Sequence, residues 1–259
     1  VAALLVAACA PVATTHLPGH DTRAVTFNIF AGNDLQRQSN LVRVAALIDS
    51  VDADIVFLQE VDRLTARSGS VVQPAELARL SGMHVEFGAS MPFDGGEFGN
   101  AILTRYPVTA RALTHYGGSD SSTEPRSLLH LTVSTPAGPL HLVATHVDHR
   151  PASGARAAQL RELEQYLARS IPAGGRIVLG GDLNARPDAP ELQGLRADLT
   201  DAWTACGSGD GHTFRSDNPD RRIDYILLRG VTCTQAWVHA TLISDHRPLV
   251  VLLHVRPQT

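Results

Sequence analysis

The feature that most constrains the fold is a short apolar run, Ile177 to Leu179, followed at once by Gly180-Gly181-Asp182-Leu183-Asn184. An apolar run of this length between glycine pairs predicts a strand buried on both faces. A carboxylate and a carboxamide then stand at its carboxyl end. In isolation such a pair is more often a turn or a helix cap than a site. Its meaning therefore depends on what the other strand ends provide.

The same alternation of apolar runs and turns continues through the first third of the chain. Strands are predicted at Arg23 to Phe30 and at Asp54 to Val61, because both runs are apolar and bounded by polar turns. Between them, a helix is predicted from apolar residues at helical spacing, namely Leu41, Val44, Ala45, Leu47 and Ile48. A second, short helix is predicted at Pro74 to Leu80, with proline in its first turn and Ser81-Gly82 at its end.

The middle of the chain predicts five strands with antiparallel neighbours, since short runs there are separated by Gly, Pro and Ser: Met83 to Ala89, Asn100 to Thr104, Val108 to Tyr116, Ser127 to Ser134 and Leu140 to His146. Beyond the strand at Ile177, the pattern predicts strands at Ile223 to Leu228, Ala236 to Ala240 and Leu249 to Val255, with helices at Ser153 to Ser170 and Glu191 to Leu195. We expect an α/β (α+β) fold in which two mixed sheets pack face to face with helices outside.

Composition removes several kinds of chemistry. The 22 basic residues are all arginine, which excludes a lysine-dependent phosphate loop, a Schiff base and an acylation dyad. The net charge is −4, and Arg221-Arg222 is the one adjacent basic pair, so no basic stripe indicates binding to long nucleic acid. A small or membrane-borne phosphate ester fits this balance at least as well.

Residues 1–20 are predicted to be the remnant of a secretory signal plus a linker, with a single domain at 21–259. Val6-Ala7-Ala8-Cys9 resembles a bacterial lipobox, which predicts membrane attachment through a lipidated Cys9 and a periplasmic or cell-surface location. Ala8-Cys9-Ala10 also fits an ordinary signal-peptidase cleavage site with small residues on either side. Export would permit a disulfide between Cys206 and Cys233, whereas spacing alone is equally consistent with two buried free thiols.

Polar side chains stand inside or at the ends of several predicted strands: Asn28, Glu60, Arg126, His146, Asp224, and Asp245-His246 before the last strand. Such groups are destabilising when buried unless they meet partners. Glu60 is consistent with a surface ion pair or with a metal ligand, and Arg126 with a phosphate clamp or a salt bridge.

These residues occur in the ordered pieces TFNI, LQE, GNAILTRYP, EPR, TH, GDLN, RIDYI and SDH, spread from residue 26 to residue 248. In this order they resemble the endonuclease/exonuclease/phosphatase superfamily, which includes deoxyribonuclease I, abasic-site endonucleases, neutral sphingomyelinases and inositol polyphosphate 5-phosphatases. The resemblance implies a four-layer αββα sandwich with its site at one edge of the two sheets. It also implies hydrolysis of a phosphodiester or phosphomonoester by metal-assisted attack of water.

The roles that the resemblance implies can be placed on residues. Glu60 and Asp245, with Asn28 nearby, would hold Mg²⁺, for which Mn²⁺ is the expected substitute, because all their donor atoms are oxygens. Asp224 would fix the tautomer of His246. Asp182 would orient or deprotonate water, and either Asp182 or His246 would be the general base. The remaining assignments are to substrate phosphate: His146 and Asn184, and additionally Arg126, Asn100 and His149.

Two departures from the family pattern bear on specificity. Phe30-Ala31-Gly32 follows Ile29 where several nucleases of the family have an acid, which puts a second metal in doubt. Asp148 and His149 extend the Thr-His pair, and are consistent either with substrate choice or with a surface network.

Three alternatives were weighed. An extracellular nuclease would need a local patch, for which Arg105, Arg126, Arg150 and Arg186 are candidates. A non-catalytic scaffold of the same fold would carry a substitution at one of the site residues, and none is present. A metallo-β-lactamase-like zinc site would need a histidine at the position of Ala144.

Overall fold

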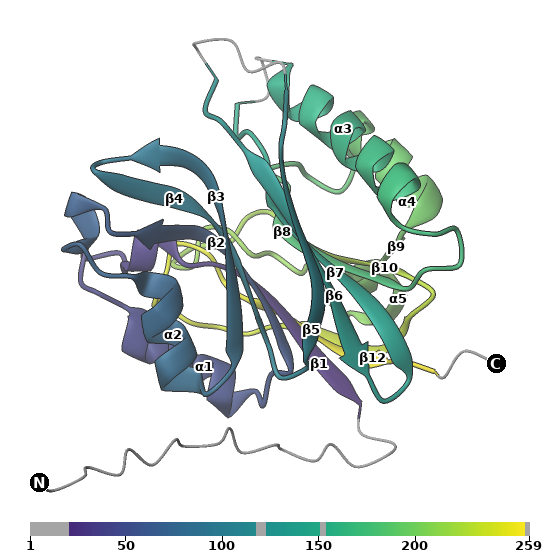
Figure 1. Ribbon diagram of the computed structural model, residues 1–259, viewed down its shortest axis with the longest axis horizontal. Coiled ribbons are helices and arrows are strands. Elements are labelled where there is room, and N and C mark those ends of the chain that lie inside the picture. Colours follow the sequence, from purple (N-terminus) through teal and green to yellow (C-terminus); the bar gives the residue numbers. More distant parts are fainter. Residues whose placement is uncertain (1–20, 118–122, 151–153, 257–259) are drawn as a thin grey trace, which may run out of the picture.

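The chain folds into two six-stranded β-sheets packed face to face, with helices on both outer faces (Figure 1). This computed structural model describes residues 21–117, 123–150 and 154–256. The predicted leader and Cys9 lie outside the described residues. The predicted four-layer αββα sandwich is confirmed.

The first sheet has the strand order β11-β12-β1-β2-β4-β3. Its strands are β1 (Thr22–Asn28), β2 (Ile55–Arg63), β3 (His84–Phe93), β4 (Gly96–Thr104), β11 (Thr232–Val238) and β12 (Leu249–His254). β1 and β2 run parallel, and the other neighbouring pairs are antiparallel. The carboxyl ends of β1 and β2 therefore meet at one edge of this sheet.

The second sheet has the order β5-β6-β7-β8-β10-β9. Its strands are β5 (Val108–His115), β6 (Ser127–Thr135), β7 (Gly138–His146), β8 (Ile177–Asp182), β9 (Thr200–Asp201) and β10 (Asp224–Arg229). Here β7 and β8 are the parallel pair, so their carboxyl ends also lie side by side.

Helices cover the outer face of each sheet, as Figure 1 shows. The apolar faces of α1 (Leu41–Ser50) and α2 (Gln73–Ser81) are buried against the first sheet, and those of α3 (Ala155–Ser170) and α4 (Gln193–Asp198) against the second. Within the described residues, 3₁₀ turns lie at Phe30–Gly32, Ala66–Ser68 and Pro190–Leu192. α2 begins with a proline in its first turn and ends at Gly82, whose left-handed φ of 68° suits a glycine. No helix in the described ranges is long and apolar enough to cross a membrane.

The two glycines that follow the apolar run at Ile177 lie inside β8 rather than in a turn. Gly180 faces the other sheet, where an added Cβ would come within 2.2 Å of the Phe57 ring, and a Cβ on Gly181 would come within 2.4 Å of the Thr145 carbonyl oxygen. The expected strand boundary at these glycines was therefore wrong. Glycine is required because the two sheets, and strands β7 and β8, approach closely at this point.

A disulfide joins Cys206 and Cys233, with an S–S distance of 2.01 Å, so the alternative of free thiols is excluded. Cys206 ends α5 (Ala202–Cys206), which follows the edge strand β9, and Cys233 lies in β11, an edge strand of the other sheet. The disulfide therefore links elements that belong to the two different sheets.

Candidate active site

Strand register alone brings three polar residues together in the second sheet. His146 pairs with Asp182 across β7 and β8, and Asp224 pairs with the same Asp182 across β8 and β10. Residues paired directly across neighbouring strands point to the same face of a sheet. All three side chains are at most 4% exposed, so the site is built into the layer between the sheets.

Asn28 connects this group to the first sheet. It ends β1, and its side-chain amide donates hydrogen bonds to Glu60 Oε1 at 3.0 Å and to Asp182 Oδ2 at 3.2 Å. Glu60 lies at an irregularity in the pairing of β2 with β4, and its backbone has a positive φ of 56°. This bulge turns the Glu60 carboxylate toward Asn28 and the pocket. The Asn28 carboxamide thus links Glu60 on the first sheet to Asp182 on the second sheet.

His246 is held over the same group by the loop before β12. The Ser244 hydroxyl donates to the Asn28 carbonyl oxygen at 2.7 Å and accepts the His246 backbone N–H at 3.3 Å. The ring Nδ1 of His246 then lies 2.8 Å from Asp224 Oδ2, and Nε2 lies 3.6 Å from Asp182 Oδ2. The imidazole is therefore placed between two buried carboxylates.

The carboxylates decide the charge of this ring. Burial alone would lower the pKa of His246, but Asp224 and Asp182 raise it to about 10, so the ring is a cation at neutral pH. Burial, together with the charge of Asp224, raises the pKa of Asp182 to about 7. An acid whose pKa lies near neutrality is suited to accept a proton from water.

His146 has the opposite electrostatic environment. Burial, followed by the positive charge of Arg126, lowers the pKa of His146 well below its usual value, so its ring is neutral. An Arg126 N–H lies 2.8 Å from the Nδ1 of His146, and the guanidinium also pairs with Glu124. On the other side, the Asn184 amide nitrogen lies 3.0 Å from Nε2. Asn184 is fixed by its own backbone N–H, which donates to Asp182 Oδ1 at 2.9 Å, and it has a positive φ of 48°.

Glu60 and Asp245 are the oxygen donors best placed to hold a cation. Burial, and then their mutual repulsion, raises the pKa of Glu60, and burial also raises the pKa of Asp245. Neither carboxylate forms an ion pair with an arginine among the described residues. Two partly buried acids without a cationic partner fit a hard divalent ion.

Asp182, Asp224 and His246 form a second cluster in which ligand atoms lie within 4.8 Å of one another. Here the Nδ1 of His246 is already bonded to Asp224, and the raised pKa keeps the ring protonated. A protonated imidazole has no lone pair to offer a metal. The Glu60 and Asp245 carboxylates, with the Asn28 amide bonded to Glu60, are a second set of oxygen donors suited to a cation.

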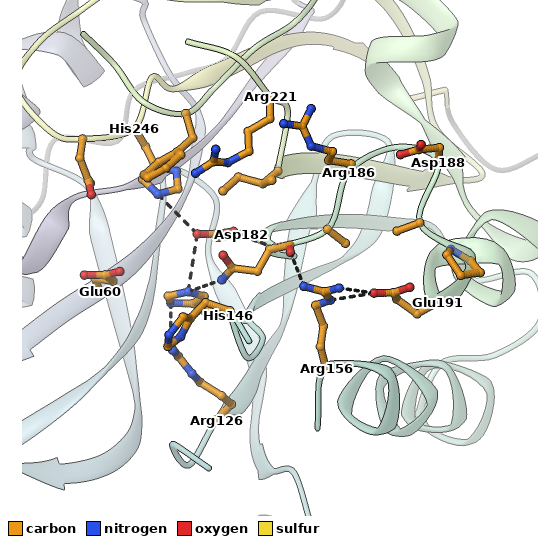
Figure 2. Close-up of a pocket in the computed structure, with 18 residues that line it drawn as sticks. Glu60, Arg126, His146, Arg156, Asp182, Arg186, Asp188, Glu191, Arg221 and His246 are labelled. Atoms are coloured by element: carbon orange, nitrogen blue, oxygen red, sulfur yellow. Dashed lines mark hydrogen bonds and ion pairs between the residues drawn. The ribbon is translucent and has the colours of Figure 1, made fainter. Parts of the chain in front are cut away.

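A pocket of about 780 Å³ opens onto these groups. Figure 2 shows His246, Asp182 and His146 converging on one end of it, with Glu60 facing them and Arg126 behind His146. The pocket continues past Asn184 between the loop from residue 185 to residue 191 and the segment around Arg221. It is therefore larger than a phosphate group requires, and leaves room for the alcohol part of an ester.

Two of the predicted phosphate contacts differ in position from the others. His149 is exposed and lines the pocket, whereas Asn100 does not. The Asn100 side chain is 1% exposed and its amide donates to the Ser127 carbonyl oxygen at 3.2 Å, between the two sheets. We correct its role to holding β4 against β6. Asp148 is fully buried and bonded to Arg150, so it belongs to the loop framework.

The proposed arginine patch does not form. Arg126 and Arg186 line the pocket, but Arg150 is turned to Asp148, and Arg105 donates to the Ala53 carbonyl oxygen just before β2. That position is at the end of the strand opposite Glu60. The prediction of a four-arginine patch was therefore wrong, because strand direction separates Arg105 from the site.

Sequence reasoning did not identify three residues of the pocket wall. The Phe214 ring lies 4.8 Å from the His246 ring, and Arg221 stacks on Phe214 with its guanidinium carbon 4.4 Å from the ring centre. Arg156, at the start of α3, donates to the Asn184 carbonyl oxygen at 2.6 Å and pairs with Glu191. The adjacent pair Arg221-Arg222 was the one local signal, whereas Phe214 and Arg156 are recognisable only from contacts distant in sequence.

Comparison with known proteins agrees with this geometry. The model of the endonuclease/exonuclease/phosphatase family matches residues 25–246. Uncharacterized protein YbhP of Escherichia coli strain K12 is 27% identical, over 90% of this chain and 96% of YbhP. A 5'-tyrosyl-DNA phosphodiesterase of Caenorhabditis elegans is 26% identical, over 78% of this chain and 54% of that protein. The crystal structure of an endonuclease/exonuclease/phosphatase from Beutenbergia cavernae is 25% identical with a TM-score of 0.74, covering 92% of this chain and 72% of that one.

A sandwich of two mixed sheets with a polar site at one edge defines the class of protein. The chain belongs to the endonuclease/exonuclease/phosphatase family.

Proposed function

We propose that the protein is a divalent-metal-dependent phosphoesterase that hydrolyses a phosphodiester or phosphomonoester, with Mg²⁺ as the ion and Mn²⁺ as a substitute. The observation that carries the proposal is the convergence of His146, Asp182 and His246 at one end of a pocket, with the Glu60 and Asp245 carboxylates facing them. This set provides the groups that phosphoester hydrolysis requires: a base, cationic and neutral hydrogen-bond donors, and an acidic cation site.

The two pKa shifts support Asp182 as the general base. With a pKa raised to about 7, Asp182 is partly ionised at neutral pH and can accept a proton from water. His246, with a pKa raised to about 10, keeps both ring protons, one of them donated to Asp224. Its positive charge and its Nε2–H then stabilise negative charge that develops on phosphoryl oxygens.

Glu60 and Asp245 would hold the cation. When bound, a divalent ion there polarises the phosphoryl group and offsets its negative charge. The Asn28 amide orients the Glu60 carboxylate through the hydrogen bond at 3.0 Å and orients Asp182 through the one at 3.2 Å. His146 and Asn184 would contact the oxygens of the transferred phosphate.

The outer half of the pocket would receive the alcohol part of the ester. Its wall combines apolar surface from Ala185, Phe214 and Ile223 with charged side chains of both signs, Arg186, Asp188 and Arg221. Such a mixed surface supports an alcohol with both an apolar ring or chain and polar groups. The C. elegans relative is a phosphodiesterase by name, which favours a diester as the first substrate to test.

The proposal is tested by incubating the purified protein with DNA, RNA, sphingomyelin, phosphoinositides and an aryl phosphodiester, with Mg²⁺ or with EDTA. We expect turnover of at least one ester that EDTA stops and that Asp182→Asn abolishes. Turnover that persists in EDTA, or no turnover of any ester, would refute it. A nuclease that neutralises several phosphates would weaken steeply with salt, whereas turnover of a small ester would respond little.

We also propose that the protein is exported, as its N-terminal residues predict, and attached to the membrane by a lipid on Cys9. The Cys206–Cys233 disulfide supports export, because disulfides persist in oxidising compartments. Intact-mass analysis of the membrane fraction from cells expressing the native gene tests this. An unprocessed and unlipidated N-terminus would contradict it.

A further inference from the structure

Arg126 lies against His146 in a way that restricts the proton positions of the ring. The Arg126 side chain is 4% exposed, and one guanidinium nitrogen lies 2.8 Å from Nδ1 of His146. A guanidinium has only N–H donors and stays protonated in proteins. Nδ1 must therefore accept this hydrogen bond, and in a neutral ring the single proton must lie on Nε2.

On the other side of the ring, the Asn184 amide would favour the opposite tautomer, with the proton on Nδ1. The Asn184 amide nitrogen lies 3.0 Å from Nε2 and also donates to the Val147 carbonyl oxygen at 3.1 Å. If Asn184 donated to Nε2, the proton would lie on Nδ1, facing the Arg126 cation. A proton on Nδ1 would face an N–H of the charged Arg126 guanidinium at 2.8 Å, whereas a proton on Nε2 faces only the N–H of the neutral Asn184 amide. The first arrangement is less favourable, because it adds the repulsion of a full positive charge. The Asp182 Oδ2 atom lies 3.5 Å from Nε2 and favours a proton there as well, so Arg126 and Asp182 select the same tautomer.

We propose that Arg126 is a positioning residue that holds His146 in the Nε2–H tautomer, so that His146 and Asn184 present two converging N–H donors to one acceptor oxygen. Two donors 3.0 Å apart repel each other, and although Asp182 Oδ2 faces Nε2 at 3.5 Å, an oxygen that accepts from both donors relieves this repulsion. An anionic phosphoryl oxygen is such an acceptor, and in this one respect the inference rests on the proposed function. The tautomer itself follows from the contacts of the protein alone.

A different role for Arg126 is direct contact with substrate. Its Nε–H has no hydrogen-bond acceptor among the described residues, and its side chain lines the pocket. In that case removal of Arg126 would weaken phosphate binding and leave the tautomer of His146 as it was. The two roles are therefore distinguished by measuring the tautomer of His146 rather than the catalytic rate.

The test is ¹⁵N NMR of histidine-labelled protein at neutral pH without ligand, with the His146 signals assigned by comparison with His146→Gln. Wild type is expected to show a neutral ring with the proton on Nε2. Arg126→Lys keeps a cationic donor and should keep this tautomer. Arg126→Met removes the donor to Nδ1 and leaves Asn184 as the donor to the ring, so a population with the proton on Nδ1 should appear even though Asp182 still faces Nε2. Arg176→Met is the control, because Arg176 is equally buried, at 3% exposed, but lies at the opposite end of β8.

A wild-type ring protonated on Nδ1, or on both nitrogens, would overturn the inference, and so would an unchanged tautomer in Arg126→Met. If Arg126→Met does not fold, Arg126→Gln replaces it, because a neutral amide can accept as well as donate and no longer excludes a proton on Nδ1. An unchanged tautomer in that variant would equally overturn the inference. In the kinetic arm, Arg126→Met should lower kcat by about 10²- to 10³-fold, the effect of losing one oriented oxyanion donor, with substantial recovery in Arg126→Lys. Failure of the proposed function would leave the protein inactive on every ester, with the NMR result intact.

Discussion

Replacing Asp224 by asparagine tests the assignment of His246 as a cation. Asp224 is fully buried, and its Oδ2 lies 2.8 Å from Nδ1 of His246. Asparagine has the same shape but removes the negative charge that does most to raise the pKa of His246 against the opposing effect of burial. We therefore expect the pKa of His246 to fall, and the ring to lose its positive charge at a lower pH.

The expected loss of rate follows from the hydrogen bond that changes. A hydrogen bond to a charged group contributes about 1.5–3 kcal/mol. Because about 1.4 kcal/mol corresponds to a factor of ten, Asp224→Asn should lower kcat/KM by roughly 10- to 150-fold. If Asp182 acts as the base and His246 as a cation, the wild-type rate should rise with pH through the Asp182 pKa of about 7, hold above it, and fall as the pH rises through the His246 pKa of about 10. In the variant this fall should begin at lower pH.

The assay is kcat/KM for an aryl phosphodiester from about pH 5 to about pH 11, with the pKa of His246 followed in parallel by NMR. Asp54→Asn is the matched control, since Asp54 is 1% exposed but precedes β2, at the end of the strand remote from Glu60. The reasoning is refuted if Asp224→Asn has the rate of wild type, or if the pKa of His246 does not fall.

Three other changes have defined outcomes. Mg²⁺ should raise the melting temperature of wild type through binding to the native state, but not that of Glu60→Gln; equal stabilisation of both would contradict the assigned site. Arg221→Gln should raise KM about 5- to 10-fold with little change in kcat, since Arg221 lines the outer pocket. Arg79→Gln is the control, because Arg79 forms a surface ion pair on α2, and an equal rise of KM in that variant would contradict the role of Arg221. Cys206→Ser should lower the free energy of unfolding by about 2–4 kcal/mol, measured by urea denaturation, because the disulfide spans 27 residues; an unchanged midpoint would be inconsistent with that contribution.

The residues at the centre of the site were predictable because each is a polar group at or near the end of an apolar strand. Asn28, Asp182 and Asp224 are at most 1% exposed, and such groups require partners. Asn28 ends β1 and Asp182 ends β8, whereas Asp224 begins β10 and pairs with Asp182 because β10 is antiparallel to β8, so all three lie at one edge of the sandwich. Local sequence, combined with the order of the motifs, was sufficient for this part.

The hairpin of β3 and β4 was only partly predictable. The expected strands ended at Ala89 and began at Asn100, but the structure extends them to Phe93 and Gly96. The added residues include Pro92, which sheet interiors exclude and which is accepted here because β3 is an edge strand. Whether a strand lies at an edge depends on the whole sheet, so a local pattern could not supply it.

The outer pocket could not be predicted for a different reason. Arg221 stacks on Phe214, and Phe214 contacts the His246 ring, through a loop that has no hydrophobic periodicity. Arg156 lies in the polar part of α3, where an arginine is expected to face solvent, yet it is only 9% exposed because it pairs with Glu191 across 35 residues. Contacts of this kind depend on loop conformation and leave no signal in the surrounding sequence.

Because Asn28 bridges the two sheets, the geometry of the site depends on how the sheets pack against each other. Its amide bonds to Glu60 on one sheet and to Asp182 on the other, so neither acid is correctly oriented unless the sheets are docked. A partly unfolded chain with each sheet intact would keep its secondary structure but have neither an oriented cation site nor an oriented base. The site is therefore complete only in states in which the two sheets are docked.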